Sequence, residues 1–165
     1  MRAYKFLRPG RVAPFSGFAW PEGEWVEGGS SALCVRGVHA CRPADLPYWI
    51  MPELWEIEVE GDVREEPRKV VAERGRLVRR IERWDAAAGH RFAEACAERT
   101  RERAEGATAE VAGYAAHAAA NAAKGEVAVV GYIAARAAEV AGGIDAYMTE
   151  RDAQAAWLAR ELELR

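Results

Sequence analysis

The sequence predicts an α+β protein in which a mostly antiparallel sheet comes first and a bundle of alanine-rich helices follows. All seven prolines lie at or before Pro67, and all but one of the six tryptophans lie at or before Trp84. After Trp84 the chain has no proline and is rich in alanine. Because proline interrupts helices and alanine favours them, this change predicts a β-rich half over 1–84 and a helical half over 85–165. The two halves could also share one core.

The first half contains short β-favouring runs bounded by glycine and proline. Leu54–Glu60 is the clearest strand, because apolar and acidic residues alternate along it. Further strands are expected over 3–7, 24–27, 37–41, 69–72 and 76–81. Gly75 predicts a hairpin turn between the last two, so we expect one sheet of about five strands. The proline-containing segment 42–50 predicts an aromatic-lined loop with at most one helical turn.

The charges of this half predict solvated surfaces. Glu56, Glu58 and Glu60 share one strand face, which favours a face open to solvent. The basic run over 74–83 predicts an exposed edge hairpin rather than a phosphate site.

The second half predicts four helices. Asp85 is a good N-cap for a helix over 86–104, and Thr108 for a second helix that ends near Lys124. A third helix is expected over 126–141, before Gly142 and Gly143, and a fourth over 144–162 with a break near Met148.

Composition and charge exclude several classes of function. The 165 residues carry a formal net charge of −3, and neither half is strongly basic, so no nucleic-acid partner is expected. No run of about 18 apolar residues occurs, because the best candidate, from Val127, is interrupted at Arg136. No membrane association is therefore expected. The charged start lacks a secretory leader, and three cysteines favour reduced thiols in the cytoplasm.

One cluster has the composition of a chemical site. On a strand, His39 and Cys41 point to the same face because side chains two positions apart do so. One interpretation is catalysis, with His39 as general acid or base, Cys41 as nucleophile and Lys5 binding an anion or a carbonyl. A second is a structural metal site formed by Cys34, His39 and Cys41. A third is a buried core thiol beside a structural histidine.

Aromatic residues suggest how a ligand would be held. Tyr48 and Trp49 lie between Pro47 and Pro52, and with Tyr4 they are expected to line a ligand-binding pocket on the sheet. The sequence specifies no cofactor, and it leaves open whether the ligand is a small molecule or a protein.

Residues 3–82 resemble an uncharacterised domain family of bacterial and phage proteins. The resemblance is carried by Tyr4-Lys5, by Cys34-Val-Arg-Gly-Val-His39-Ala-Cys41 and by Trp55-Glu-Ile-Glu-Val-Glu-Gly61. It implies a shared fold and a shared site at Tyr4, Lys5, His39 and Cys41, without a settled activity.

The end of the chain has a resemblance of its own. The pattern Glu150-Arg-x-x-Gln154-x-x-Trp157-Leu158 is similar to the tails of uncharacterised bacterial proteins, some of them described as immunity proteins. This suggests the alternative function, an immunity or regulatory module that binds a protein through residues 107–162. Alanine-rich helices of this kind are also compatible with a dimer.

Overall fold

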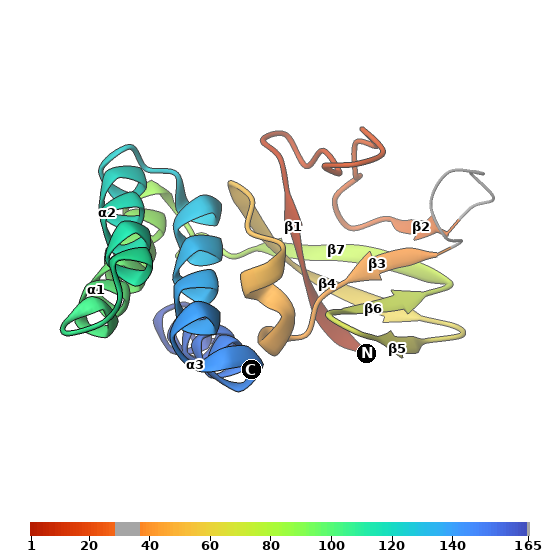
Figure 1. The fold of residues 1–165 in the computed structure, drawn as a ribbon. Coiled ribbons are helices and arrows are strands. Elements are labelled where there is room, and N and C mark those ends of the chain that lie inside the picture. Colours follow the sequence, from red (N-terminus) through yellow and green to blue (C-terminus); the bar gives the residue numbers. More distant parts are fainter. Residues whose placement is uncertain (29–36, 165) are drawn as a thin grey trace. The chain divides into compact units, whose positions relative to one another are not determined.

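The computed structural model describes residues 1–28 and 37–164 of the chain (Figure 1). The α+β class is confirmed, because antiparallel sheets precede three helices along the chain. The chain divides into two compact units, residues 1–84 and 85–165. We call them the N-terminal unit and the helical unit.

The N-terminal unit contains two small antiparallel sheets rather than the single sheet that the sequence predicts. One has the strand order β1-β4-β7-β2 and the other the order β3-β6-β5. The strands are β1 Arg2–Leu7, β2 Trp25–Glu27, β3 Val38–Ala40, β4 Glu53–Glu60, β5 Arg64–Glu66, β6 Lys69–Ala72 and β7 Arg74–Arg80. A short 3-10 helix, η1 (Pro43–Tyr48), occupies the segment expected to be a loop.

The hairpin predicted around Gly75 is wrong. β6 pairs with β3 and β5, whereas β7 pairs with β4 and β2, so the chain passes from one sheet to the other at Glu73. Gly75 lies inside β7, where a Cβ atom would come within 2.8 Å of Val38 Cγ1. The glycine therefore allows β7 to pack closely against Val38 of β3. The hairpin that does form joins β5 to β6 through a turn at Arg68, whose φ is 65°.

The glutamates of β4 and the arginines of β7 form ion pairs with each other, whereas the sequence predicts two separate solvent-facing charged surfaces. β7 is an interior strand of its sheet, so the prediction of an edge hairpin is also wrong. Its arginines pair with the acidic face of β4: Arg74 with Glu60, Arg76 with Glu58 and Arg79 with Glu56. Arg2 adds a second partner for Glu56, which is only 5% exposed.

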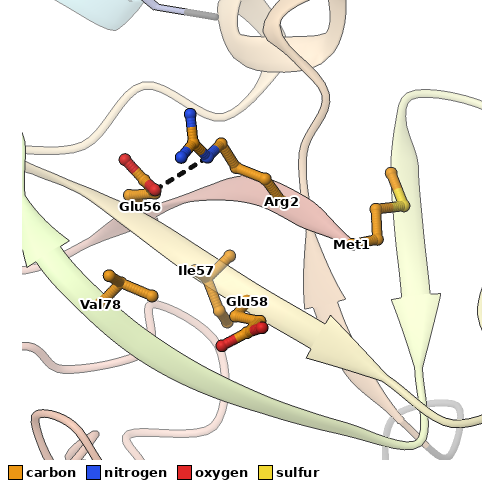
Figure 2. Close-up of a pocket in the computed structure, with 6 residues that line it drawn as sticks. All are labelled: Met1, Arg2, Glu56, Ile57, Glu58 and Val78. Carbon is orange, nitrogen blue, oxygen red and sulfur yellow. Dashed lines mark ion pairs between the residues drawn. The ribbon is translucent and has the colours of Figure 1, made fainter.

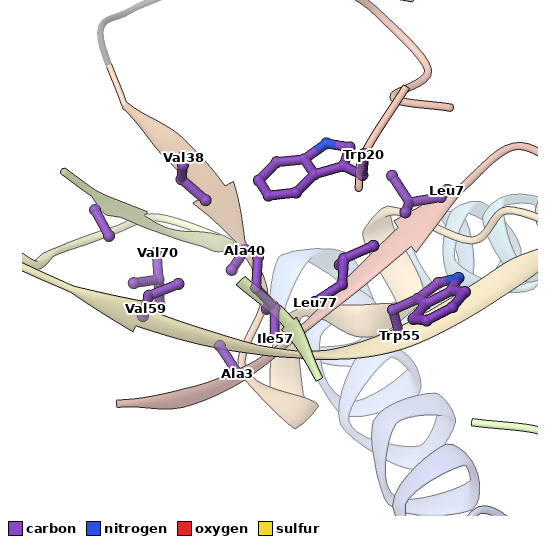
Figure 3. Packing of buried hydrophobic residues seen from close by; sticks show 11 residues of the cluster. Ala3, Leu7, Trp20, Val38, Ala40, Trp55, Ile57, Val59, Val70 and Leu77 are labelled. Carbon is purple, nitrogen blue, oxygen red and sulfur yellow. The ribbon is translucent and has the colours of Figure 1, made fainter. Parts of the chain in front are cut away.

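The core of the N-terminal unit lies between the two sheets. Side chains from both sheets and from the segment that follows β1 form one cluster (Figure 3). Its members are Ala3, Leu7, Trp20, Val38, Ala40, Trp55, Ile57, Val59, Val70, Ala72 and Leu77. Alternate residues of β1 and β4 thus turn inward, as the period of a strand requires.

The helical unit consists of α1 (Ala86–Ala104), α2 (Ala109–Ala123) and α3 (Val127–Glu161). The side chains of Asp85 and Thr108 accept hydrogen bonds from Ala88 N and Val111 N, as expected of N-caps. α3 consists of two helical stretches joined at a kink, so the predicted end of the third helix at Gly142 and Gly143 is confirmed. The second stretch has no break at Met148.

Among the described residues, α3 is the one helix long and apolar enough to cross a membrane by length and composition. The interruption at Gly142 and Gly143 limits its first continuous part to 127–141. A membrane span needs about 20 continuous apolar residues, and this part is shorter. The part that follows contains the buried charges Glu150 and Arg151.

Candidate functional site

The structure brings four of the predicted site residues together on neighbouring strands. Tyr4 N donates to Cys41 O at 2.8 Å, and Cys41 N donates to Tyr4 O at 2.7 Å. This pairing joins β1 to the chain directly after β3, so Lys5 and His39 are also neighbours. Both Tyr4 and Cys41 are buried.

Lys5 lies on the inward side of β1, between the core residues Ala3 and Leu7. Its Nζ donates to His39 O at 2.5 Å and lies 4.9 Å from the ring centroid of Trp20. Burial lowers the pKa of Lys5 from its ordinary 10.5 to about 8, and the electrostatic influence of Cys41 opposes part of this shift. A substantial share of the side chain is therefore a neutral amine in mildly alkaline solution.

The environment of Cys41 does not favour a thiolate. Burial raises the pKa of the thiol to about 12, and the attraction of Lys5 offsets only part of the increase. Cys41 is thus protonated at neutral pH, whereas nucleophilic attack by cysteine requires the thiolate. Val38 and Ala40 belong to the core, so His39 points to the opposite side of β3, as does Cys41.

The residues that the structure describes do not form a metal site. No group of three or more His, Cys, Asp and Glu side chains among them could hold an ion. Cys34, the third ligand of the metal interpretation, lies outside the described residues.

Tyr48 and Trp49, the predicted ligand-facing pair, belong to a different set of contacts. Trp49 Nε1 donates to Arg68 O at 2.6 Å, and the Arg68 guanidinium lies 4.5 Å from the centroid of the Tyr48 ring. Phe15 packs edge-on against Trp49, with ring centroids 6.3 Å apart, although 77% of Phe15 is exposed. We call Phe15, Tyr48, Trp49 and Arg68 the aromatic surface.

Sequence reasoning did not place Phe15 or Arg68 beside Tyr48 and Trp49. Phe15 follows Pro14 and precedes Ser16-Gly17, a composition typical of a turn tip, and Arg68 follows Pro67 in the β5–β6 turn. Turn tips are exposed, so both positions could have been flagged as accessible. Their contact with Trp49 could not have been predicted, because it joins three segments that are far apart in the chain.

A hollow of about 330 Å³ lies elsewhere on the N-terminal unit (Figure 2). It is lined by Met1, Arg2, Glu56, Ile57, Glu58 and Val78. The Arg2–Glu56 ion pair crosses it at 2.9 Å, and Glu58 pairs with Arg76. Its charges therefore already have partners, and none of the predicted site residues lines it.

These observations define a two-unit α+β protein whose N-terminal unit carries a half-buried lysine and an exposed aromatic surface. The chain belongs to the DUF7666 family, described as a domain of unknown function, which matches residues 1–89. The match covers more than half of the chain, including the whole N-terminal unit, and confirms the predicted resemblance to an uncharacterised domain family. No curated protein and no solved structure matches the chain.

Proposed function

We propose that the N-terminal unit is a protein-binding module that uses the aromatic surface. The observation that carries this proposal is Phe15, which is 77% exposed yet held against Trp49. A single exposed apolar side chain is ordinary on a protein surface. Here the exposed phenylalanine adjoins a tryptophan, a tyrosine and an arginine, residue types that are enriched at protein interfaces.

The aromatic surface is held in place before any partner arrives. Trp49 is fixed by its hydrogen bond to Arg68 O, and the Arg68 guanidinium stacks on Tyr48. Side chains fixed in this way lose little rotamer freedom on binding, so more of the contact energy contributes to affinity.

The charges around this surface suggest the chemistry of the partner. Arg42 pairs with Asp45 and Glu65. Arg68, by contrast, makes no ion pair with any of the residues described. A peptide segment with an apolar side chain next to a carboxylate would cover Phe15 and Trp49 and neutralise Arg68.

Selection from a displayed library of random peptides tests this proposal. We expect the selected peptides to combine an aromatic or aliphatic residue with a nearby Asp or Glu. Phe15→Ala and Trp49→Ala should each lower their affinity at least about tenfold, about 1.4 kcal/mol. Arg68→Gln should weaken acidic peptides while leaving peptides without the carboxylate unchanged.

Tyr132→Ala provides the matched control. Tyr132 is an aromatic residue of the helical unit, 56% exposed on α3, and Val129, Ile144 and Met148 are also exposed there. The Tyr132→Ala variant should bind the selected peptides as the unmodified chain does. Loss of binding in Tyr132→Ala alone would move the interaction to the helical unit, the alternative that the sequence suggests. Selection of no peptide would refute the proposal.

A second candidate function is covalent chemistry at Lys5, favoured by its lowered pKa. A neutral amine attacks the carbonyl carbon of an aldehyde or ketone and releases water to form a Schiff base. Tyr4 and Cys41 lie beside this position, and the backbone oxygen of His39, which accepts from Lys5 Nζ, holds the amine in place.

Reductive trapping tests this second candidate. The chain would be treated with acetaldehyde and borohydride near pH 8, and each lysine analysed by mass spectrometry. We expect Lys5 to be modified faster than the exposed Lys124, the matched control. If Lys124 reacts faster, Lys5 is a structural residue whose ammonium is held by His39 O.

A further inference from the structure

The helical unit contains a buried cluster of charged and polar side chains between α1 and α3. At its centre is Glu150, which is 1% exposed. The carboxylate accepts hydrogen bonds from Arg99 Nη2 at 2.8 Å, Gln154 Nε2 at 3.0 Å and Arg103 Nη2 at 3.1 Å. Arg99 Nε adds a contact of 3.2 Å to each carboxylate oxygen.

Glu150 stays ionised despite its burial. Removal from water would raise its pKa, but the hydrogen bonds from Arg99, Gln154 and Arg103 outweigh that effect and hold the pKa below its ordinary value. Gln154 is itself fixed, because its Nε2 also donates to Gly131 O and its Oε1 accepts from Arg151 Nη1. The carboxylate therefore has a fixed position against α1.

The positive charge of this cluster exceeds what Glu150 can balance. Arg99 and Arg103 bring two guanidinium groups to a single carboxylate. Arg103 uses Nη2 for Glu150, while its Nη1 is buried and has no hydrogen-bond partner among the described residues. A buried, unsatisfied donor on a cation is unfavourable unless an acceptor is supplied.

From this geometry we propose that Arg103 and Arg99 bind a small oxyanion, with Arg103 Nη1 as the principal donor. Guanidinium groups suit oxyanions because their N–H bonds form a planar fork that matches two oxygen atoms. Glu150 orients both forks from the buried side. Each arginine keeps 26% of its side chain exposed, so an anion can approach the guanidinium groups from solvent. Arg103 Nη1 is itself shielded from solvent, so the anion reaches this donor only when the Arg103 side chain turns.

The site is independent of the aromatic surface, which belongs to the N-terminal unit. Phosphate, sulfate and a carboxylate such as acetate share the required chemistry, and direct comparison separates them. A preference for phosphate would indicate a phosphorylated ligand, and a preference for acetate would indicate a carboxylic acid.

The test is titration of the full chain with sodium phosphate, and with acetate, at constant ionic strength. Binding is followed on the side-chain resonances of ¹⁵N-labelled arginine. We expect one of the two anions to saturate the site with a Kd below about 1 mM. The resonances of Arg103 and Arg99 should shift, while those of Arg101 stay in place. Arg101 is the internal reference, because it is exposed and paired with Glu98 and Glu105.

Two variants complete the experiment. Arg103→Lys keeps the positive charge but removes the fork, so binding should weaken about tenfold. Arg101→Gln should bind as the unmodified chain does. Absence of saturable binding, or equal shifts at Arg101 and Arg103, would overturn the proposal. If Arg103→Lys does not fold, the resonances of the unmodified chain still decide the question.

Discussion

Lys5 in the N-terminal unit is half-buried and Glu150 in the helical unit is buried, and the protein treats their charges in opposite ways. Lys5 has a backbone carbonyl and the face of Trp20 as its partners, and burial lowers its pKa toward the neutral amine. Glu150 has two guanidinium groups and an amide, and its pKa is lowered toward the charged carboxylate. A lowered pKa favours the deprotonated form of a group. Lys5 therefore tends to lose its charge, whereas Glu150 keeps its charge.

The difference teaches that the two interiors depend on charge to different degrees. The core of the N-terminal unit is apolar on both sides of Lys5, so an uncharged side chain of similar length would fit. The contact between α1 and α3 is built around the Glu150 carboxylate, and removing that charge leaves two half-buried arginines without their partner.

The largest effect should come from Glu150→Gln. Breaking a buried ion pair by removing one partner costs about 3–5 kcal/mol, because the remaining charge stays buried. We expect a loss of this size in the free energy of unfolding of the helical unit, measured by urea denaturation with circular dichroism at the helical band. Glu98→Gln removes an exposed partner of Arg101, and because water screens this pair the variant should unfold almost as the unmodified chain does. Equal losses in the two variants would contradict the role assigned to Glu150.

Titration of Lys5 should produce the next largest effect. The folded pKa is about 8 and the ordinary value is 10.5. Between these values the unfolded chain binds more protons than the folded chain, so the free energy of unfolding rises with pH. At about 1.4 kcal/mol per pKa unit the full gain is about 3 kcal/mol.

The buried cysteines act in the opposite direction. The pKa of Cys41 is raised to about 12, so above its ordinary 9.0 the unfolded chain loses that proton first and stability falls. Comparison with Lys5→Met isolates the lysine. The stability advantage of Lys5→Met should shrink as pH rises from 8 to 10.5, measured by the fluorescence of the tryptophans, all but one of which lie in the N-terminal unit. A pH-independent difference would show that Lys5 keeps its ordinary pKa.

A smaller effect is expected where β7 packs against β3 of the other sheet. In Gly75→Ala the new methyl group would lie 2.8 Å from Val38 Cγ1 and 3.1 Å from Ile57 Cδ1. Overpacking of this kind costs about 1–3 kcal/mol. Urea denaturation of the N-terminal unit, followed by tryptophan fluorescence, measures it. An unchanged midpoint would show that β3 can move away from β7.

The smallest effect should come from the matched glycine of the helical unit. In Gly131→Ala the methyl group would lie 3.3 Å from Phe92 Cε1. Replacing glycine within a helix gains about 1 kcal/mol of helix propensity, which offsets the tighter contact. We therefore expect a change within about 1 kcal/mol by circular dichroism. A loss as large as that of Gly75→Ala would mean that the helical packing is equally rigid.

Local signals predicted the fold class and the helix starts. The composition change after Trp84 and the N-caps Asp85 and Thr108 act over a few residues, so a single sequence reveals them. The strand pairing depends on distant partners. Gly75 has the composition of a turn, but contact with Val38 makes it a packing residue of β7. No local pattern distinguishes these two uses of glycine.

The candidate sites likewise combine features that the local sequence reveals with contacts that depend on distant partners. Alternation along the strand places His39 and Cys41 on one face, yet the partners of Lys5 and Cys41 come from the pairing of Tyr4 with Cys41. Similarly, the four-residue spacing of Glu150 and Gln154 puts both on one helix face, but Arg99 and Arg103 are supplied by α1. Trp157 of the same pattern packs on Phe92. The tail pattern thus contains residues of the helical core.

The interruption of α3 at Gly142 and Gly143 has a consequence for its motion. Residues 141–145 are exposed, and the two glycines leave the helical range of dihedral angles. Amide protons near this point exchange with solvent through local fraying alone. Those beside Ala137 or Leu158 exchange only through a larger opening of the structure. Hydrogen exchange would therefore divide α3 into two slowly exchanging stretches with a fast gap between them. In its local opening, α3 therefore behaves as two shorter helices.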